Sequence, residues 1–515
     1  MKEGVGQIYT LSAPTAGWNA RVPLPKVPED CALSLINWFP DSWGVKKRNG
    51  TLRKTATAFT SGCETLIPYN KPDGTQKILA CGDHTIQLVN ADGTKTDNTN
   101  GCTITSNRWQ YVQFYDKLFM VNGADRCLTY DGTTLTVAGF TYNGGADANL
   151  SNVQVYNERL WFTCQGVLYY GGTRYITGAL TASTIQYQFQ KGGALLFVGG
   201  STWNLSQTAL AVLVIATDQG EILIYSGDPN DTSWNLEGHF FIPRPVGPRA
   251  FFLFGAEMNI ITELGVYRLS EIREGSSLEQ LGRYIRASQE IDKAFAIAGQ
   301  QFYSNFGWGA CTYTRGDMLI VNVPVSATQS VQYVMSTLNG AWCQFQNINA
   351  LSWCISNGYA YYGGIDGHVW QFDVGQNDGA YPSYGAAASY SGDAIVCSGQ
   401  TAFTPCGDDR VNKAFKLIRP ILTTDGDATL SIALNTNFLS NSTLTPVSIT
   451  GSGNSAWDND TWDNAAWADP DVAILDWTSV DGRGLNCSVV FGGSFKDVDI
   501  ELLGFHIQFE GGGAL

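Results

Sequence analysis

The sequence lacks the residues that most metal and catalytic motifs require. Its 515 residues include only four histidines, and its twelve cysteines, spread from Cys31 to Cys487, contain no CxxC pair. Structural zinc needs clustered thiolate and imidazole ligands, so this spacing excludes a recognisable zinc site. The chain also has no Gly-rich loop ending in Gly-Lys-Ser/Thr, no GxSxG elbow and no HExxH. We therefore predict no catalytic residues, no metal and no cofactor.

Long hydrophobic runs are also missing. No segment approaches the roughly 20 apolar residues that cross a bilayer, and the N-terminus lacks a charged region followed by an apolar block. We expect no membrane segment and assembly in a reducing cytoplasm. Most cysteines lie inside apolar runs, for example Cys164 and Cys354, and are predicted to be buried free thiols that act as small hydrophobes.

Charge is scarce and unbalanced, since charged residues make up 15% of the chain and the formal net charge is −15. A general nucleic-acid clamp needs a basic surface that displaces counterions from phosphate, so this class is disfavoured. Two explanations of the acidic excess stay open. It keeps a large surface soluble, or it forms a wall that surrounds a duplex without gripping it, because like charges repel.

The residues that are abundant favour an all-β fold. The chain has 57 Gly, 23 Tyr, 25 Phe and 15 Trp but only 5 Met, and 44% of its residues are hydrophobic. Aromatic residues are enriched in strands and Gly in tight turns, so many short strands are expected.

A hairpin pattern recurs between residues 61 and 375, in which an apolar strand, a polar turn and a second strand follow one another. Spacings of roughly 40 to 60 residues are typical of β-propeller blades, so we predict a β-propeller-like domain here. Near-helical spacing of apolar residues, after a capping box at Ser277–Gln280, predicts a short helical insertion at about 271–300. The seven hairpins are Ile78–Leu88, Lys117–Tyr130, Arg159–Tyr170, Ala211–Tyr225, Glu257–Leu269, Asp317–Tyr333 and Tyr359–Phe372.

Residues 1–60 are predicted to be an N-terminal arm followed by the first strands. Four prolines keep the early part extended or irregular, because each removes a backbone donor. A basic cluster follows, and it is either a solvated turn or a docking point for an acidic or phosphate-bearing partner such as an adjacent protein. The cluster consists of Lys46, Lys47, Arg48, Arg53 and Lys54.

Residues 376–515 are predicted to form a separate C-terminal β-sandwich-like domain. Residues 376–408 are rich in Gly, Ala, Ser and Tyr and are expected to be a linker or long loop. Phe415 to Phe438 is expected to be a hairpin that turns at Asp425-Gly426, and Asn486 to Phe509 supplies further strands.

Between those strands lie Trp457, Trp462 and Trp467, with Asp and Asn between them. The rings either fold back over the sandwich or contact another subunit, since Trp is enriched in interface hot spots. A calcium loop is disfavoured because the Gly and distal Glu of that motif are absent.

One stretch, Glu221 to Ile272, resembles the tail nozzle proteins of short-tailed bacteriophages, the family of packaged-DNA stabilisation proteins and tail tubular protein B. The similarity is carried by Gly227-Asp228-Pro229, Trp234 to Gly238, Phe241 to Gly247 and Thr262 to Ser270. Leu35 to Asp41 and Leu338 to Trp342 are similar to an early and a later element of the family, and the C-terminal third matches more loosely.

The resemblance implies a structural protein of the virion tail, assembled in the host bacterial cytoplasm. It implies a homo-oligomeric ring of six copies below the portal and adaptor, with contacts to a tail adaptor or portal-proximal protein and to tail fibre or spike proteins. Double-stranded DNA would pass through its lumen without sequence specificity and be retained until infection.

Two other functions stay open beside this one. The chain could be a receptor-binding tail protein, or a glycan-degrading one that needs a cleft with paired carboxylates. Forty-six acidic residues offer too many candidates for such a pair to be assigned from the sequence.

Overall fold

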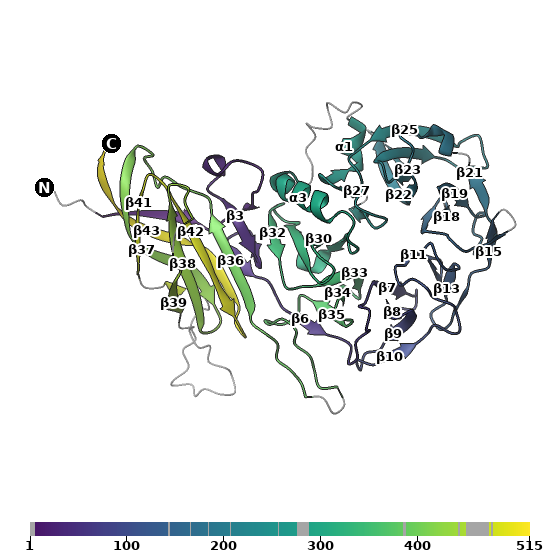
Figure 1. Cartoon of the computed structure of the whole chain (residues 1–515), viewed down its shortest axis with the longest axis horizontal. Helices are drawn as coiled ribbons and strands as arrows, with labels where there is room; N and C mark the ends of the chain where they lie inside the picture. Colours follow the sequence, from purple (N-terminus) through teal and green to yellow (C-terminus); the bar gives the residue numbers. More distant parts are fainter. Residues whose placement is uncertain are drawn as a thin grey trace.

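The computed structural model describes residues 6–142, 145–164, 166–183, 185–205, 208–255, 257–274, 288–384, 388–440, 443–449, 473–474 and 477–514. Strands dominate these residues and helices are few, which confirms the all-β prediction (Figure 1). The described chain has two parts. A ring of small sheets lies beside a pair of larger sheets that contains the C-terminus.

The ring region, residues 51–372, consists of small sheets set side by side, mainly antiparallel. Three sheets have four strands each: β7 (Thr65–Asn70), β8 (Gln76–Gly82), β9 (Thr85–Val89) and β10 (Lys95–Asp97); β11 (Gln110–Phe114), β12 (Lys117–Val121), β13 (Leu128–Tyr130) and β14 (Leu135–Val137); β17 (Asn152–Tyr156), β18 (Arg159–Cys164), β19 (Val167–Tyr170) and β21 (Thr181–Ser183). A three-stranded sheet, β15 (Phe140–Tyr142), β16 (Gly145–Ala146) and β20 (Gly178–Ala179), lies between the second and third in sequence.

The second half of the ring region continues in the same way. Its sheets are β22 (Leu195–Leu205), β23 (Thr208–Thr217), β24 (Glu221–Ser226) and β25 (Asn235–Phe241); β26 (Phe251–Phe254), β27 (Glu257–Thr262) and β28 (Gly265–Arg268); β29 (Gly309–Tyr313), β30 (Met318–Pro324), β31 (Ser330–Ser336) and β32 (Trp342–Phe345); and β33 (Ala350–Ser356), β34 (Tyr359–Gly364) and β35 (Val369–Phe372) with β6 (Thr51–Arg53).

All seven hairpins predicted between residues 61 and 375 are present. Each is a pair of neighbouring antiparallel strands in its own sheet, namely β8 with β9, β12 with β13, β18 with β19, β23 with β24, β27 with β28, β30 with β31 and β34 with β35.

The inner strands of several ring sheets are buried on both faces because each sheet packs between two neighbours, whereas outer strands such as β10 and β25 are largely exposed or half-buried. Every residue of β18 and β24 is buried, and the middle of each strand is a continuous apolar run. Each core cluster joins adjacent sheets. Ile67 and Leu79 of the first sheet, for example, pack with Trp109 and Met120 of the second.

The two ends of the ring region meet through the chain's early residues. β6 pairs antiparallel with β35, the last strand of the ring, with Gln371 opposite Leu52. Phe59 and Leu66 from the start of the ring share a core with Cys354 and Val369 from its end. A strand from before the first sheet therefore completes the last sheet.

Helices occupy the place where an insertion was predicted. α1 (Leu269–Glu274), η3 (Gln289–Ile291) and α3 (Asp292–Phe302) lie there, and α3 buries Phe295 and Ala298 as its spacing indicated. The capping box at Ser277–Gln280 lies outside the described residues. Three further short 3-10 turns are η1 (Leu24–Lys26), η2 (Gln186–Gln188) and η4 (Thr314–Gly316).

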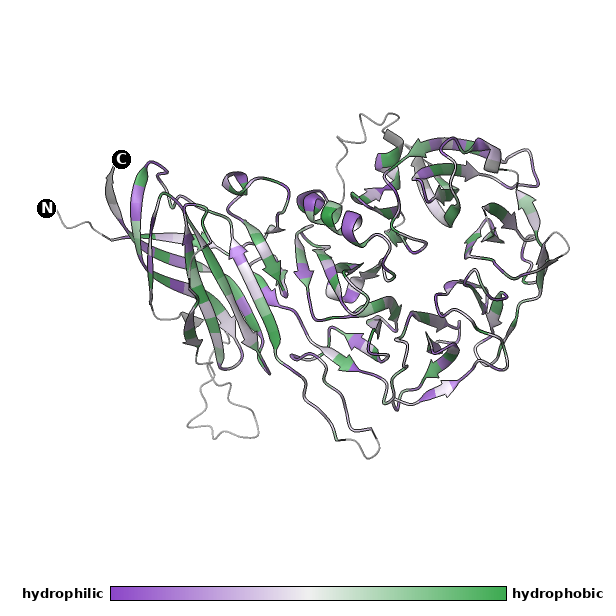
Figure 2. Ribbon diagram, in the orientation of Figure 1, coloured by the Kyte–Doolittle hydropathy of each residue, from purple (hydrophilic) through white to green (hydrophobic). Residues whose placement is uncertain are grey.

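The second part consists of two sheets that share one core. One contains β1 (Gln7–Ser12), β4 (Trp38–Pro40), β5 (Val45–Lys47), β37 (Val411–Thr424), β40 (Ala473–Ile474), β41 (Thr478–Gly484) and β43 (Ile500–Ala514). The other contains β2 (Gly17–Trp18), β3 (Cys31–Ile36), β36 (Ile395–Thr401), β38 (Ala428–Thr436), β39 (Thr445–Ile449) and β42 (Cys487–Phe495). Figure 2 shows apolar residues along these strands.

The predicted hairpin from Phe415 to Phe438 is wrong. β37 and β38 are both strands, but β37 pairs with β43 in one sheet and β38 pairs with β42 in the other. Their connection crosses between the sheets, and the amide of Asp425 donates to the carbonyl of Asp499 in the neighbouring crossing (3.3 Å). Alternating apolar residues show that a strand has one buried face, but they do not show whether the next strand lies beside it or opposite it.

The early residues also serve more than one sheet. The predicted arm and first strands, residues 1–60, contribute β1, β4 and β5 to one large sheet, β2 and β3 to the other, and β6 to the ring. β36 lies within the expected linker 376–408 and pairs with β3 and β42. Through β2 and β3, the sheet of β29–β32 continues into the second part as one ten-stranded sheet.

A turn device repeats in the first two sheets of the ring. Asp83, between β8 and β9, accepts hydrogen bonds from the amide (2.8 Å) and hydroxyl (2.7 Å) of Thr60 and the amide of Ser61 (2.8 Å). Asp125, between β12 and β13, accepts the corresponding bonds from Thr105 and Ser106. Each carboxylate thus ties the turn of a sheet to the segment that enters it.

These bonds make stability depend on pH. Burial acts to raise the pKa of Asp83, but the bonds from Thr60 and Ser61 outweigh it and lower the pKa to about 2. A depressed pKa stabilises the fold above about pH 4, and the contribution is lost as pH falls toward 2. We expect Asp83→Asn to lower the free energy of unfolding at pH 7 by about 1 kcal/mol, with a smaller difference at pH 3. Urea denaturation at both pH values measures this.

Asp409→Asn is the matched control, because the Asp409 side chain is 80% exposed. It should leave the urea midpoint unchanged at both pH values. An Asp83→Asn deficit that is equally large at pH 3 and pH 7 would contradict the assignment.

Candidate functional site

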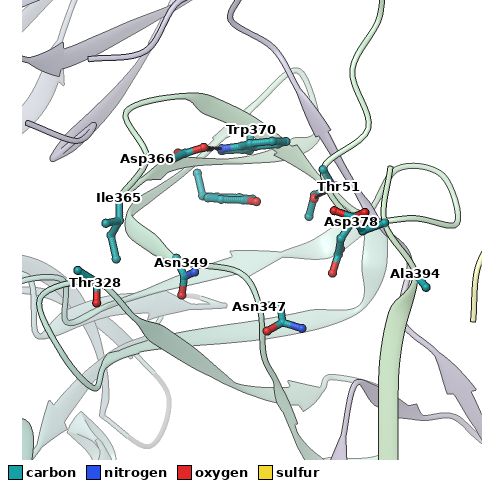
Figure 3. Close-up of a pocket in the computed structure, with 12 residues that line it drawn as sticks. Thr51, Thr328, Asn347, Asn349, Ile365, Asp366, Trp370, Asp378 and Ala394 are labelled. Atoms are coloured by element: carbon teal, nitrogen blue, oxygen red, sulfur yellow. Dashed lines mark hydrogen bonds between the residues drawn. The ribbon is translucent and has the colours of Figure 1, made fainter. Parts of the chain in front are cut away.

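A solvent-open pocket of about 480 Å³ lies where the last sheet of the ring meets the segment that leads to the second part (Figure 3). Its walls come from β6, from the connections before and after β31 and β32, from the β34–β35 hairpin, and from residues 378–394. The lining residues are Thr51, Thr328, Asn347, Asn349, Tyr362, Ile365, Asp366, Trp370, Asp378, Gly379, Asp393 and Ala394.

One wall is fixed by the buried guanidinium of Arg48, whose side chain is fully shielded from solvent. It donates to both carboxylate oxygens of Asp378 (2.8 and 2.5 Å). Its remaining N–H groups donate to the side-chain oxygen of Asn37 (2.9 Å) and to the carbonyls of Asn49 and Gln346 (3.0 Å each). A guanidinium has five donors, so every one is satisfied.

Aromatic side chains form a second wall. The rings of Tyr362 and Trp370 are nearly parallel, at 11° with centroids 6.3 Å apart. The indole N–H of Trp370 donates to the carboxylate of Asp366 (3.2 Å to each oxygen), which fixes the orientation of the ring. Burial raises the pKa of the Tyr362 hydroxyl far above its usual range, so that the phenol stays neutral.

Polar groups on the other side of the pocket are exposed. Figure 3 shows Asn347 and Asn349 across the pocket from Asp366 and Trp370, with Thr328 beside them. Asn347 adopts a left-handed backbone (φ 68°), which Asn tolerates better than most residues. The side-chain oxygen of Asn349 accepts from the amide of Ser330 (3.3 Å).

The chemistry of this pocket favours binding. Both oxygens of Asp378 are occupied by Arg48, and both oxygens of Asp366 accept from Trp370. Asp393 accepts from the hydroxyl of Tyr390 (2.5 Å). A glycosidase needs one carboxyl that holds a proton and a second that attacks or activates water, and Asp378 cannot take either role while Arg48 holds it. Within the described residues, no group of three or more His, Cys, Asp or Glu side chains is placed to hold a metal ion.

The predicted basic cluster divides into buried and accessible residues. Lys47 and Arg48 are 2% and 1% exposed, and the ammonium of Lys47 donates to the carbonyl of Gln376 (2.8 Å). These two cations are not available to a partner, because both side chains are buried. The sequence pattern could not show this, since a basic run usually marks a solvated surface.

The other three basic residues lie nearer the surface. Lys46 forms an exposed ion pair with Asp41 (3.0 Å). The guanidinium of Arg53 lies 3.8 Å from the centroid of Tyr381, and Lys54 is partly exposed. A docking role stays a prediction for these three.

The predicted contact residues Trp457, Trp462 and Trp467 lie outside the described residues.

Two further cavities lie along the inner strands of the ring. They hold about 240 and 490 Å³ and share Gln110, Arg249, Gly307 and Trp308. Arg249 donates to the carbonyls of Glu64 (3.2 Å) and Trp109 (2.9 Å) and to the hydroxyl of Thr65 (2.6 Å), so it ties the loop before β26 to the first two sheets. The larger of the two lies within the roughly 300–1,000 Å³ that small-molecule sites occupy.

The sequence pattern does not single out the pocket residues, although Tyr362, Asp366 and Trp370 lie in the predicted hairpin Tyr359–Phe372. Thr51, Asn347, Trp370 and Asp393 are far apart in the chain, and no local motif links them.

The predicted burial of the cysteines is confirmed. All twelve are unpaired, eleven are buried and Cys102 is partly exposed. Among the described residues, no helix combines the length and apolar character needed to cross a bilayer.

Fold and pocket together define an all-β protein with a polar, aromatic-walled cavity at the junction between its two parts.

No protein-family model and no curated protein matches the chain. Two solved structures share a distant likeness. The computationally designed Ika8 protein is 11% identical with a TM-score of 0.34, and the match covers 63% of this chain and 100% of Ika8. BBS1N in complex with ARL6DN is 10% identical with a TM-score of 0.40, over 64% of this chain and 98% of that one. Neither likeness is close enough to bear on function.

The Arg48–Asp378 pair should dominate local stability. We expect Arg48→Met to lower the free energy of unfolding by about 3–5 kcal/mol, because it leaves the Asp378 carboxylate without its partner. Adding Asp378→Asn should recover part of that loss, because the stranded charge is then removed. Thermal or urea unfolding of the two variants measures both effects.

Lys46→Met is the control for Arg48→Met. Lys46 pairs at the surface, where its side chain is 44% exposed, so its loss should cost no more than about 1 kcal/mol. Equal losses for the two variants would show that Arg48 has no special structural role.

Proposed function

We propose that the ring region is a seven-bladed β-propeller and that the chain is a structural subunit of a bacteriophage tail nozzle. The observation that carries this proposal is the place of the family-like residues in the fold. Asp228 of the Gly227-Asp228-Pro229 turn accepts from the guanidinium of Arg159 (2.9 and 3.1 Å), which belongs to the preceding sheet. Trp234 stacks on Trp161 and Tyr225 (centroids 5.4 and 4.6 Å apart, 12° and 11° between planes).

These residues link one sheet to the next. Arg159 is 5% exposed, and the hydroxyl of Tyr156 donates to the carbonyl of Gly227 (3.2 Å). The residues that carry the resemblance to the nozzle family therefore make contacts between sheets. Mechanical contacts of this kind are what a structural subunit of a tail needs.

The continuity between the two parts supports the same proposal. The ten-stranded sheet runs from β29 in the ring to β39 in the second part, with β2 and β3 in the middle. Gly17 allows this join, because its φ is +78° and a Cβ there would lie 2.5 Å from the carbonyl oxygen of Trp342. A subunit with one sheet through both parts resists bending between them, as a particle under internal DNA pressure requires.

Under this proposal, DNA passes between copies of the chain. The two cavities described in the ring hold about 240 and 490 Å³, which is the scale of a small molecule and not of a DNA duplex. A lumen for DNA must then be formed by several subunits, six by resemblance to the family, below the portal and adaptor. The net charge of −15 suits a lumen wall that does not adhere to phosphate.

The receptor-binding and glycan-degrading alternatives predict other behaviour. A receptor-binding protein would bind host cells as an isolated chain, and a glycan-degrading one would release reducing sugar from host glycans. Arg48 holds both oxygens of Asp378 in the pocket at the ring closure, so this carboxylate is not placed for acid–base catalysis or for a covalent intermediate.

Cryo-electron microscopy of particles that carry the protein tests the proposal. We expect a ring of six copies between the adaptor and the end of the tail, with acidic side chains on the inner face. A position at the tip of a fibre, or a monomer in the particle, would contradict it.

The tryptophans at 457, 462 and 467 give a second test. If they contact a neighbouring subunit, replacing all three with Ser should weaken assembly by more than tenfold, because aromatic hot spots contribute more than about 1.4 kcal/mol. Native mass spectrometry of the full chain measures the assembled fraction. Trp43→Ser is the control, since Trp43 is 83% exposed in the β4–β5 turn. Loss of folding with no change in assembly of the folded fraction would favour the alternative that the rings cover their own domain.

A further inference from the structure

We propose that the pocket at the ring closure binds a neutral saccharide, one or two sugar rings in size. This inference does not depend on a role in a tail nozzle. It rests on the combination of groups that line the pocket, which suits a ligand that has an apolar face and many hydroxyl groups.

The size of the pocket fits a small ligand. Its volume of about 480 Å³ lies within the roughly 300–1,000 Å³ that small-molecule sites occupy. The walls come from segments far apart in sequence that are held by the Arg48 contacts and by the amide of Gly379, which donates to the hydroxyl of Thr51 (2.9 Å). The pocket is therefore largely formed before any ligand enters, which reduces the entropy cost of binding.

The aromatic wall provides an apolar surface. Tyr362 is only 5% exposed and packs behind Trp370, so the partly exposed ring of Trp370, oriented by its bonds to Asp366, supplies this surface. The C–H face of a pyranose is apolar and can pack on such a ring without loss of its hydroxyl bonds, which point outward around the sugar's edge. Aromatic side chains carry both apolar area and a fixed geometry, so they also set the orientation of the ligand.

The polar groups are mixed in kind. Asp366 and Asp393 are acceptors, while the amides of Asn347 and Asn349 and the hydroxyl of Thr328 both donate and accept. A sugar hydroxyl donates one hydrogen bond and accepts others, so it can use carboxylates and amides in the same site. Neither a cation nor an anion could use both kinds of group in this way.

A cation would use the carboxylates but make no contact with the NH₂ donors of Asn347 and Asn349, so half of the polar lining would not contribute to its recognition. An anion would be repelled by Asp366 and Asp393 and by the net charge of −15. The Arg48 guanidinium cannot help an anion, because its five donors are already satisfied within the protein. A neutral polyhydroxylated ligand is the class that the whole lining accepts.

Saturation-transfer-difference NMR with the full chain tests this proposal. The probes are glucose, galactose and N-acetylglucosamine as monosaccharides, and maltose, cellobiose and lactose as disaccharides, at millimolar concentration. Spermidine serves as the cationic probe. We expect transfer to at least one sugar, strongest at its ring C–H protons, and no transfer to spermidine. The comparison of single with double rings shows whether the site takes a free sugar or the end of a longer chain.

Asn347→Gly is the informative variant, because Gly adopts the left-handed backbone at this position without strain. It should weaken sugar binding about five- to tenfold through the lost hydrogen bonds while the protein stays folded. Asn357→Gly is its matched control, since Asn357 is also exposed with a positive φ (52°) but does not line the pocket, and it should leave affinity unchanged. Transfer to none of the sugars, transfer to spermidine alone, or equal affinity in Asn347→Gly and the unaltered chain would overturn the proposal.

Discussion

The contacts of Arg48 constrain the arrangement of the two parts more than any other single interaction. A charged guanidinium can be buried only where its donors are satisfied, because an ion without partners loses several kcal/mol of solvation. Arg48 meets this condition by bonding to Asn37 after β3, to Gln346 after β32 and to Asp378 at the start of the segment that leaves the ring. Displacing any of these segments would leave one or more N–H donors of the buried guanidinium without an acceptor. Their relative positions are therefore fixed together.

The closure of the ring depends on the same region. Arg48 lies only three residues before β6, which supplies the outer strand of the last ring sheet. Because β6 pairs with β35 on one side and Asn377 and Ala380 bond to Thr51 on the other, the closing strand lies between the ring and the segment that enters the second part. The pocket forms at this junction. Its shape is then a consequence of how the chain closes the ring, and no single local motif specifies it.

The contrast between local and distant pairing explains which predictions succeeded. Each hairpin of the ring joins strands next to each other in sequence, so its turn residues and apolar runs were sufficient to predict it. Phe415 and Leu430 lie on strands with equally clear alternation, yet they face each other from two sheets across one core. The partner of β37 is β43, some eighty residues later, and single-strand patterns do not contain that information. The same limit hid the pocket, since Thr51, Asn347 and Asp393 meet only through the tertiary fold.

The misassigned basic residues show how burial changes the meaning of net charge. Arg48 and Arg159 neutralise Asp378 and Asp228 inside the protein, so neither member of these pairs contributes to the field at the surface. Lys47 is also buried, and its ammonium donates to a backbone carbonyl while the carboxylates of Asp499 and Asp378 act on its charge. Acidic residues are buried as well, since Asp147 and Glu221 are fully buried and Asp125 is 6% exposed. The formal total of −15 therefore does not give the solvent-facing charge, because the burial of each charged residue is set by the tertiary fold and a run of cations in the sequence can lie partly in the core.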